Sequence, residues 1–277
     1  MRGGDQHGYA AVEVDEHAHP EGPQASGQYG SLDQWKFTEQ GSVKQLSRDG
    51  SVHVTDEVFN SASHLMAAMF SILGTAILVS GASAQGAPWK IVSFAIYGLS
   101  LVSLFAASTL HHSIDSSPRV EETLRMVDYL AIYPLIAGTL TPLCLVFFHG
   151  TTLGWSFFGV AWALAITGMV LTATHFRKVP KWWSMTFYVT LGWLGAFLSI
   201  PLYAKVHSGG LSLLALGGVF YTVGGVVFSV ETPNPVPGKF GFHEIWHIFV
   251  ILGAALHWCL MFLYVLPWHY SPASGGG

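Results

Sequence analysis

The sequence predicts an all-α membrane protein, a bundle of seven transmembrane helices whose N-terminus is cytoplasmic. Hydrophobic residues make up 51% of the 277 residues and charged residues only 10%, against about a quarter in soluble domains. The apolar residues gather in blocks of about twenty, the length that a helix needs to cross the hydrocarbon core. Basic residues fall mostly between alternate blocks, and this asymmetry predicts the orientation.

The chain divides into a tail, a transmembrane domain and a short end. Residues 1–56 are rich in Gly, Ser, Gln, His and acidic residues without apolar periodicity, which predicts a disordered cytoplasmic tail. Residues 57–266 form the seven-helix domain, and residues 267–277 form a short non-cytoplasmic tail. The expected spans are 63–84, 91–112, 126–148, 153–175, 184–204, 211–229 and 243–266. Four of the breaks between spans contain proline, which stops a helix.

The basic residues set the orientation. With seven spans, one side of the membrane holds the N-terminal tail and every second connection. Of the 12 Lys and Arg residues, only Lys90 and Lys205 fall on the opposite side. An excess of basic residues marks the cytoplasmic side, so we expect the N-terminus inside and the C-terminus outside.

Composition also excludes some partners. The net charge is −4, and no basic cluster is present, which excludes a nucleic-acid partner. Cys144 and Cys259 each lie in an apolar segment, where a small buried side chain is the simplest interpretation. Membrane lipids are the expected partners, and the sequence indicates no protein partner.

Five polar residues are expected to meet near the cytoplasmic face. His247 lies four positions after His243, so the two side chains share one face of a helix and can share a metal ion. Ser108 and His112 have the same spacing at the cytoplasmic end of span 91–112, and Asp128 lies at the start of the next span. The predicted topology places all five at one depth of the membrane.

This group of residues predicts a zinc site. Three histidines with one open position are a typical catalytic arrangement for Zn²⁺, here His112, His243 and His247. Asp128 and Ser108 are then the candidate catalytic residues, because they could orient and deprotonate a water molecule. Alternatively, the histidine pair could be hydrated at the interface, Asp128 could cap its helix, and Ser108 could bond its own backbone.

The run His243-Glu244-Ile245-Trp246-His247 matches the H-E-x-x-H pattern of zinc proteases. Those enzymes take a third ligand from further along the chain, but Gly253 stands where that histidine is expected, and no Asp or Glu follows Glu244. Glu244 also lies at the helix mouth, where it could face water. It is therefore the second choice, after Asp128, for a general base.

Three further histidines, His64, His111 and His257, are other candidates for this site. His111 neighbours His112, but a helix turns by about 100° per residue, so we expect only one of them at the centre and choose His112. His64 could contact the ligands from the first span or simply end a helix. His257 lies deeper in the membrane and is expected to pack in the core.

Four sequence blocks together resemble the hemolysin III and progestin/adiponectin receptor family of seven-span proteins. The blocks are 57–60 with His64, 107–112, 128–142 and 241–247. The resemblance, which extends to a superfamily that includes alkaline ceramidases, implies zinc held by the three histidines, with Asp128 and Ser108 at the water. Tyr129 and His111 depart from the usual family pattern.

Two functions fit this site. The first is a zinc-dependent hydrolase of lipid amides such as ceramide or another fatty-acyl lipid, with Trp246 along the path of the acyl chain. The second is a receptor or membrane-homeostasis protein with structural zinc, which a fourth protein ligand would indicate. A pore is disfavoured, because no helix has a charged stripe that could line an aqueous path. A retinal protein would need a lysine in the last span, which has none. Asp128 beside the histidines favours zinc over a bis-histidine haem.

Overall fold

The computed structural model describes residues 56–176, 178, 180–236 and 239–269, together with two short strands. The strands, β1 (Trp35–Phe37) and β2 (Val43–Gln45), pair in antiparallel register. The predicted disordered tail over residues 1–56 otherwise lies outside the described residues, as does most of the predicted tail over 267–277. Both stay predictions.

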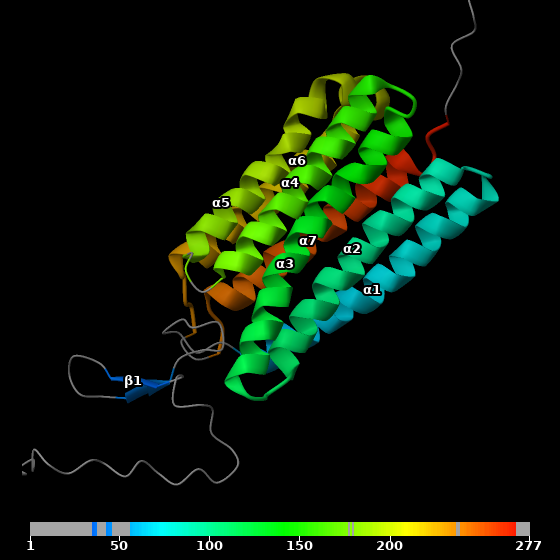
Figure 1. Ribbon diagram of the computed structural model, residues 1–277. Coiled ribbons are helices and arrows are strands. Elements are labelled where there is room, and N and C mark those ends of the chain that lie inside the picture. The colour runs from blue at the N-terminus through cyan, green and yellow to red at the C-terminus, as the bar shows by residue number, and fades with distance from the viewer. Residues whose placement is uncertain are drawn as a thin grey trace, which may run out of the picture.

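The membrane part of the described chain is helical (Figure 1). It consists of α1 (Glu57–Ala84), α2 (Pro88–Ser113), α3 (Pro118–Pro142) with η2 (Leu143–Phe147), α4 (Thr152–His175), α5 (Lys181–Gly192) with η3 (Trp193–Leu198), α6 (Ser199–Val230), and α7 (Phe242–Leu260) with η4 (Met261–Val265). Among the described residues, six continuous helical stretches are long and apolar enough to cross a membrane. The predicted α-helical, multi-pass membrane architecture is confirmed.

Several helices begin earlier than the apolar blocks predicted. α1 begins at Glu57 after Asp56, whose side chain accepts a hydrogen bond from the Phe59 N–H at 2.9 Å and so caps the helix. α3 begins at Pro118 rather than at residue 126, because proline suits the first turn of a helix. The length of an apolar block in the sequence indicates only the part of a helix that lies inside the hydrocarbon core. The polar first turns therefore extend α1 and α3 beyond it.

One helical stretch of 49 residues, Trp182–Val230, contains a break. At His207 the backbone has φ 49° and ψ −164°, which is not helical. Beyond this break the chain runs back along itself, since the Trp193 indole N–H donates to the Thr222 hydroxyl at 2.9 Å. The break lies between the predicted spans 184–204 and 211–229. The count of seven spans stays a prediction.

Apolar side chains lie both inside the bundle and on its perimeter. Leu78, Phe94 and Leu202 are fully buried, whereas Phe70 is 67% exposed and Ile200 is 86% exposed. Large exposed apolar surfaces are rare on soluble monomers. They are what a helix bundle presents to lipid.

Close helix contacts hold this bundle together, because burying apolar surface gives little advantage in a lipid environment. At Gly98 of α2, a Cβ atom would lie 2.1 Å from Oγ1 and 2.7 Å from Cβ of Thr75 on α1. The missing side chain thus allows the two helices to approach. At Gly159 of α4, by contrast, a Cβ would meet nothing within 4 Å.

We therefore expect Gly98→Ala to destabilise the protein, by about 1–3 kcal/mol through overpacking. Gly159→Ala is the matched control, and it should leave stability unchanged or slightly raised because alanine favours a helix. Thermal unfolding of both variants in detergent measures the difference. Equal melting temperatures for the two variants would show that α1 and α2 are not in close contact at Gly98.

Candidate metal centre

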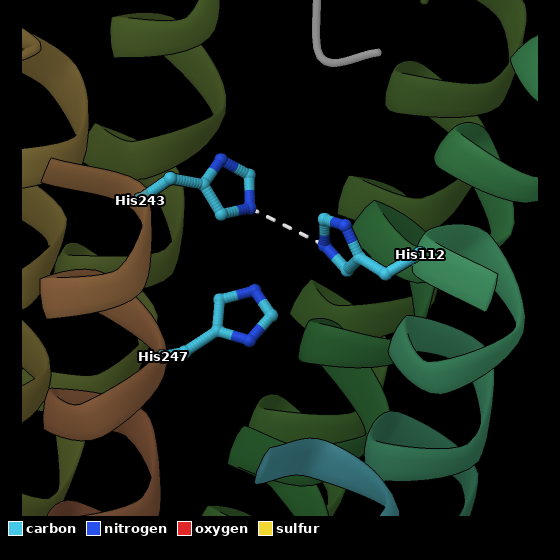
Figure 2. Close-up of side chains that lie close together, drawn as sticks. All are labelled: His112, His243 and His247. Atoms are coloured by element: carbon cyan, nitrogen blue, oxygen red, sulfur yellow. Dashed lines mark hydrogen bonds between the residues drawn. The ribbon is translucent and has the colours of Figure 1, made fainter. Parts of the chain in front are cut away.

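Three histidines from two helices converge at one end of the bundle. His112 lies in the last turn of α2, and His243 and His247 lie in the first turns of α7. Their rings turn toward a common point (Figure 2), and one nitrogen of each lies within 4.8 Å of the other two. All three are buried, with exposures of 1–4%. These residues could hold a metal ion.

The spacing of these nitrogens fits a small tetrahedral ion. Nε2 of His112 and Nε2 of His243 are 3.3 Å apart. Two nitrogens bound to one tetrahedral zinc ion, at about 2.0–2.1 Å each, are separated by about 3.3 Å. Nδ1 of His247 is buried without a hydrogen-bond partner among the described residues. A shared cation would satisfy the lone pairs that converge here, which a single proton between two rings would not.

Glu57 orients one of the three rings. Its Oε2 atom lies 2.6 Å from Nδ1 of His112, and the His112 side chain is almost fully buried. A carboxylate on the second ring nitrogen fixes the tautomer and increases the basicity of a metal-binding histidine. Glu57 thereby directs Nε2 of His112 at the common point. Sequence reasoning assigned no role to Glu57, since its only visible signal was membership of the block at 57–60.

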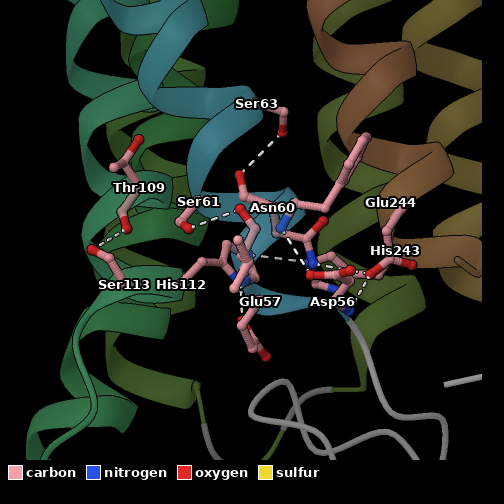
Figure 3. A network of polar contacts seen from close by, with 12 residues as sticks. Asp56, Glu57, Asn60, Ser61, Ser63, Thr109, His112, Ser113, His243 and Glu244 are labelled. Carbon is pink, nitrogen blue, oxygen red and sulfur yellow. Dashed lines mark hydrogen bonds and ion pairs between the residues drawn. The ribbon is translucent and has the colours of Figure 1, made fainter. Parts of the chain in front are cut away.

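Glu244 joins the start of α1 to the start of α7 (Figure 3). Its Oε1 accepts hydrogen bonds from the Asp56 N–H at 2.7 Å and from the Asn60 amide at 3.1 Å. Its Oε2 accepts from the Gly241 N–H at 2.7 Å, which caps α7. Glu244 is only 1% exposed, so it does not face water at the helix mouth. The start of α1 covers it, and its oxygens already bind these three donors.

His64 supports the site without sharing its ion. The rings of His64 and His247 are stacked, with centroids 3.8 Å apart and planes at 19°. A ligating imidazole holds its metal in the plane of its own ring. Two nearly parallel stacked rings therefore cannot bind the same ion, and His64 acts by holding the ring of His247 in place.

Asp128 and Ser108 lie beside the histidines, as expected. Both line a small cavity of about 50 Å³ together with His243 and His111, and the Ser108 hydroxyl lies near the Asp128 carboxylate. This volume exceeds the roughly 10–15 Å³ that one water molecule requires. The structure thus brings all five predicted site residues together. Their chemical roles remain predictions.

The two departures from the family pattern both border this site. His111 is buried with His112, and its ring lies within 4.8 Å of ligand atoms of His112 and Asp128. The neighbouring residues His111 and His112 of α2 therefore both border the group of histidines and Asp128. The expectation that only His112 lies at this site is wrong. Tyr129 lines the small cavity, and its backbone carbonyl accepts a hydrogen bond from the Tyr188 hydroxyl at 2.9 Å.

A larger cavity adjoins the small one. It measures about 350 Å³, lies among α3, α5, α6 and α7, and is lined mostly by apolar side chains. Its size falls within the range of about 300–1,000 Å³ for small-molecule sites. The walls common to both cavities are Ile132, Leu135, Met185, Tyr221 and Trp246. A ligand could thus extend from the polar cluster into an apolar chamber.

Replacing Glu244 tests whether it joins α1 to α7. Glu244→Gln replaces one of the two accepting oxygens by an amide NH2, which then faces a donor instead of bonding it, so we expect a loss of about 2–3 kcal/mol of unfolding free energy. Glu121→Gln is the control, because Glu121 lies near the surface, where the bond that it accepts from the Ser116 N–H is long, at 3.3 Å, and exposed. Chemical denaturation in detergent measures both. Similar stability of the two variants would contradict the proposed role.

Replacing Glu57 tests the orientation of His112. Glu57→Gln should weaken zinc binding by about 10–100-fold, the usual cost of losing such a carboxylate. The affinity is measured by competition with a chelator, and visible spectra of the Co²⁺-loaded protein report the ligand geometry. The exposed Asp115→Asn is the control and should retain wild-type affinity. Unchanged affinity in Glu57→Gln would show that the carboxylate does not serve a metal.

Comparisons with known proteins agree with this architecture. The model of the family described as haemolysin-III related matches residues 52–258. Hemolysin-3 of Bacillus cereus is 39% identical over 215 residues, which cover 77% of this chain and 94% of that protein. The Hemolysin-3 homolog of Bacillus subtilis is 37% identical over 76% of this chain and 94% of its own length. Heptahelical transmembrane protein 5 of Arabidopsis thaliana is 29% identical over 60% of this chain and 48% of its own length. The chain belongs to the haemolysin III-related family and is an integral, multi-pass membrane protein.

Proposed function

We propose that this protein is a seven-span, zinc-dependent hydrolase of lipid amides, with its N-terminus in the cytoplasm. The observation that supports it best is the junction of two unlike cavities. A polar cavity holds Asp128 and Ser108 beside three converging histidines, and it borders a much larger apolar cavity. An amide bond with a long acyl chain matches this combination.

The seven-span topology rests on the break at His207. A straight helix of 49 residues would measure about 73 Å, more than twice the hydrocarbon thickness of about 30 Å. The break and the contact between Trp193 and Thr222 instead favour two antiparallel crossings. The site end of the bundle then coincides with the side that holds most basic residues, which favours a cytoplasmic N-terminus.

The chain's own residues provide for proton transfer. Hydrolysis joins the oxygen of a water molecule to the amide carbonyl carbon and breaks the carbon–nitrogen bond. Asp128, held by Ser108, accepts a proton from the water and returns it to the departing nitrogen. Bound zinc, held by His112, His243 and His247, would supply a Lewis acid that polarises the carbonyl and acidifies water.

The apolar cavity would receive the acyl chain. Trp246 lines both cavities, and its ring lies against α6, where a Cβ at Gly224 would be 3.0 Å from the indole. It forms a rigid wall along the path that leads from the reacting bond to the chain. Ceramide is the substrate that the family resemblance indicates, and any amide of a long fatty acid has the same chemistry.

One observation favours a second candidate, a receptor or membrane-homeostasis protein with structural zinc. The small cavity of about 50 Å³ has room for water but is too small for an amide together with its headgroup. Hydrolysis then requires this end of the bundle to open. A permanently closed centre would instead serve as a structural anchor.

The deciding experiment combines zinc analysis with a ceramide hydrolysis assay on the purified protein. We expect one zinc ion and turnover in the wild type. Asp128→Asn should keep zinc but lose activity by about 10²–10⁴-fold, and His243→Ala should lose zinc. His149→Ala, a histidine outside the cluster, is the control and should keep both properties.

The other outcomes separate the two candidates. Stoichiometric zinc without turnover of any lipid amide, in the wild type and in Asp128→Asn alike, would favour the structural role. A folded, purified protein that binds no zinc would overturn the assignment of the metal centre.

A further inference from the structure

The large cavity contains few polar groups, and most of them are already bonded. The hydroxyls of Ser199, Thr139 and Thr222 each donate to a carbonyl of the local backbone. The Tyr188 hydroxyl and the Trp193 indole N–H also donate to protein acceptors. The protons of these groups are therefore not available to a ligand acceptor without breaking a protein hydrogen bond.

Two side chains in the cavity wall differ from these. Nδ1 of His257 and the hydroxyl of Tyr221 are both buried, and neither has a hydrogen-bond partner among the described residues. Their rings lie close together, with centroids 5.6 Å apart. Such groups are costly in an apolar interior unless a ligand or water satisfies them. Together they form a second polar site, deeper in the membrane than the metal centre.

The bonding of His257 determines what this site accepts. Its Nε2 lies 3.1 Å from the carbonyl oxygen of Leu214. A carbonyl can only accept, so Nε2 bears the proton, and the neutral ring leaves Nδ1 as an acceptor. The ring is fixed there, because a Cβ at Gly217 would lie 2.3 Å from it. Nδ1 requires a donor, and the hydroxyl of the neighbouring Tyr221 ring, whose centroid is 5.6 Å away, also lacks a partner among the described residues. A ligand hydroxyl satisfies both.

We propose that the large cavity binds an acyl chain with a hydroxyl group near its middle, recognised by His257 and Tyr221. This proposal rests on the proposed function, in which the cavity receives the chain. His257 lies ten residues beyond His247 on α7, about 15 Å along the helix axis. An extended chain advances about 1.25 Å per carbon, given bonds of about 1.5 Å, so the hydroxyl belongs near the twelfth carbon.

The test measures binding of fatty acids to the purified full-length protein in detergent, by displacement of radiolabelled stearic acid. We expect 12-hydroxystearic acid to bind about tenfold more tightly than stearic acid, the gain of satisfying buried groups. The 2-hydroxy isomer should show no gain, because its hydroxyl lies near the carboxyl end. Ethanolamides of the same acids show whether the hydroxyl preference holds for an amide as well as for a free acid.

Variants connect the preference to the residues. Tyr221→Phe removes one oxygen and should abolish most of the tenfold preference for 12-hydroxystearic acid over stearic acid. His257→Phe should do the same if it folds. Tyr203→Phe, at an exposed tyrosine, is the matched control and should keep the preference.

Each failure has a distinct meaning. Equal binding of stearic and 12-hydroxystearic acids, in both free-acid and amide forms, would overturn the hydroxyl site and leave the proposed hydrolase intact. A preference for the hydroxylated chain in only the free acids or only the ethanolamides would support the site. It would also show whether the bound chain belongs to a free fatty acid or to an amide. A preference that survives in Tyr221→Phe and in folded His257→Phe would overturn the assignment to these residues. If no chain binds at all, the acyl cavity of the proposed function fails as well.

Discussion

The candidate site depends on one face of α1. Glu57, Asn60 and His64 are spaced three and four residues apart, so they share that face. They contact His112 of α2, Glu244 of α7 and His247 of α7, in that order. A buried carboxylate is costly unless several donors offset its desolvation. The three hydrogen bonds to Glu244 stabilise it and thereby hold α1 against the two helices that supply the histidines.

The same end of the bundle is closed toward the aqueous side. The first turn of α1 covers Glu244, and the three histidines are buried beneath it. On the opposite side, the small cavity shares its wall with the large apolar cavity. A ligand could therefore extend from the polar cluster into the large apolar cavity, as the proposed lipid substrate requires.

Much of this arrangement could be predicted from the sequence, because it depends on local spacing. Apolar length predicted the helices, and four-residue spacing predicted that His243 and His247 share a face. The pairing of Glu57 with His112 could not be predicted, since it joins residues 55 positions apart on two helices with no repeat between them. Nor could the role of Glu244, for which the H-E-x-x-H setting suggested only a second choice, after Asp128, for a general base. Its partners Asp56 and Asn60 become visible only when α1 is packed against α7.

The stacking of His64 on His247 bears directly on the choice between an open and a closed metal centre. A fourth histidine nearby would at first favour a closed, structural site. Because the two rings are stacked and nearly parallel, with centroids 3.8 Å apart, no single ion can lie in the planes of both rings. Three histidines then leave one position of a tetrahedral ion for another ligand. The adjoining cavity contains Asp128 and Ser108, so we infer that the open position faces the groups able to move a proton.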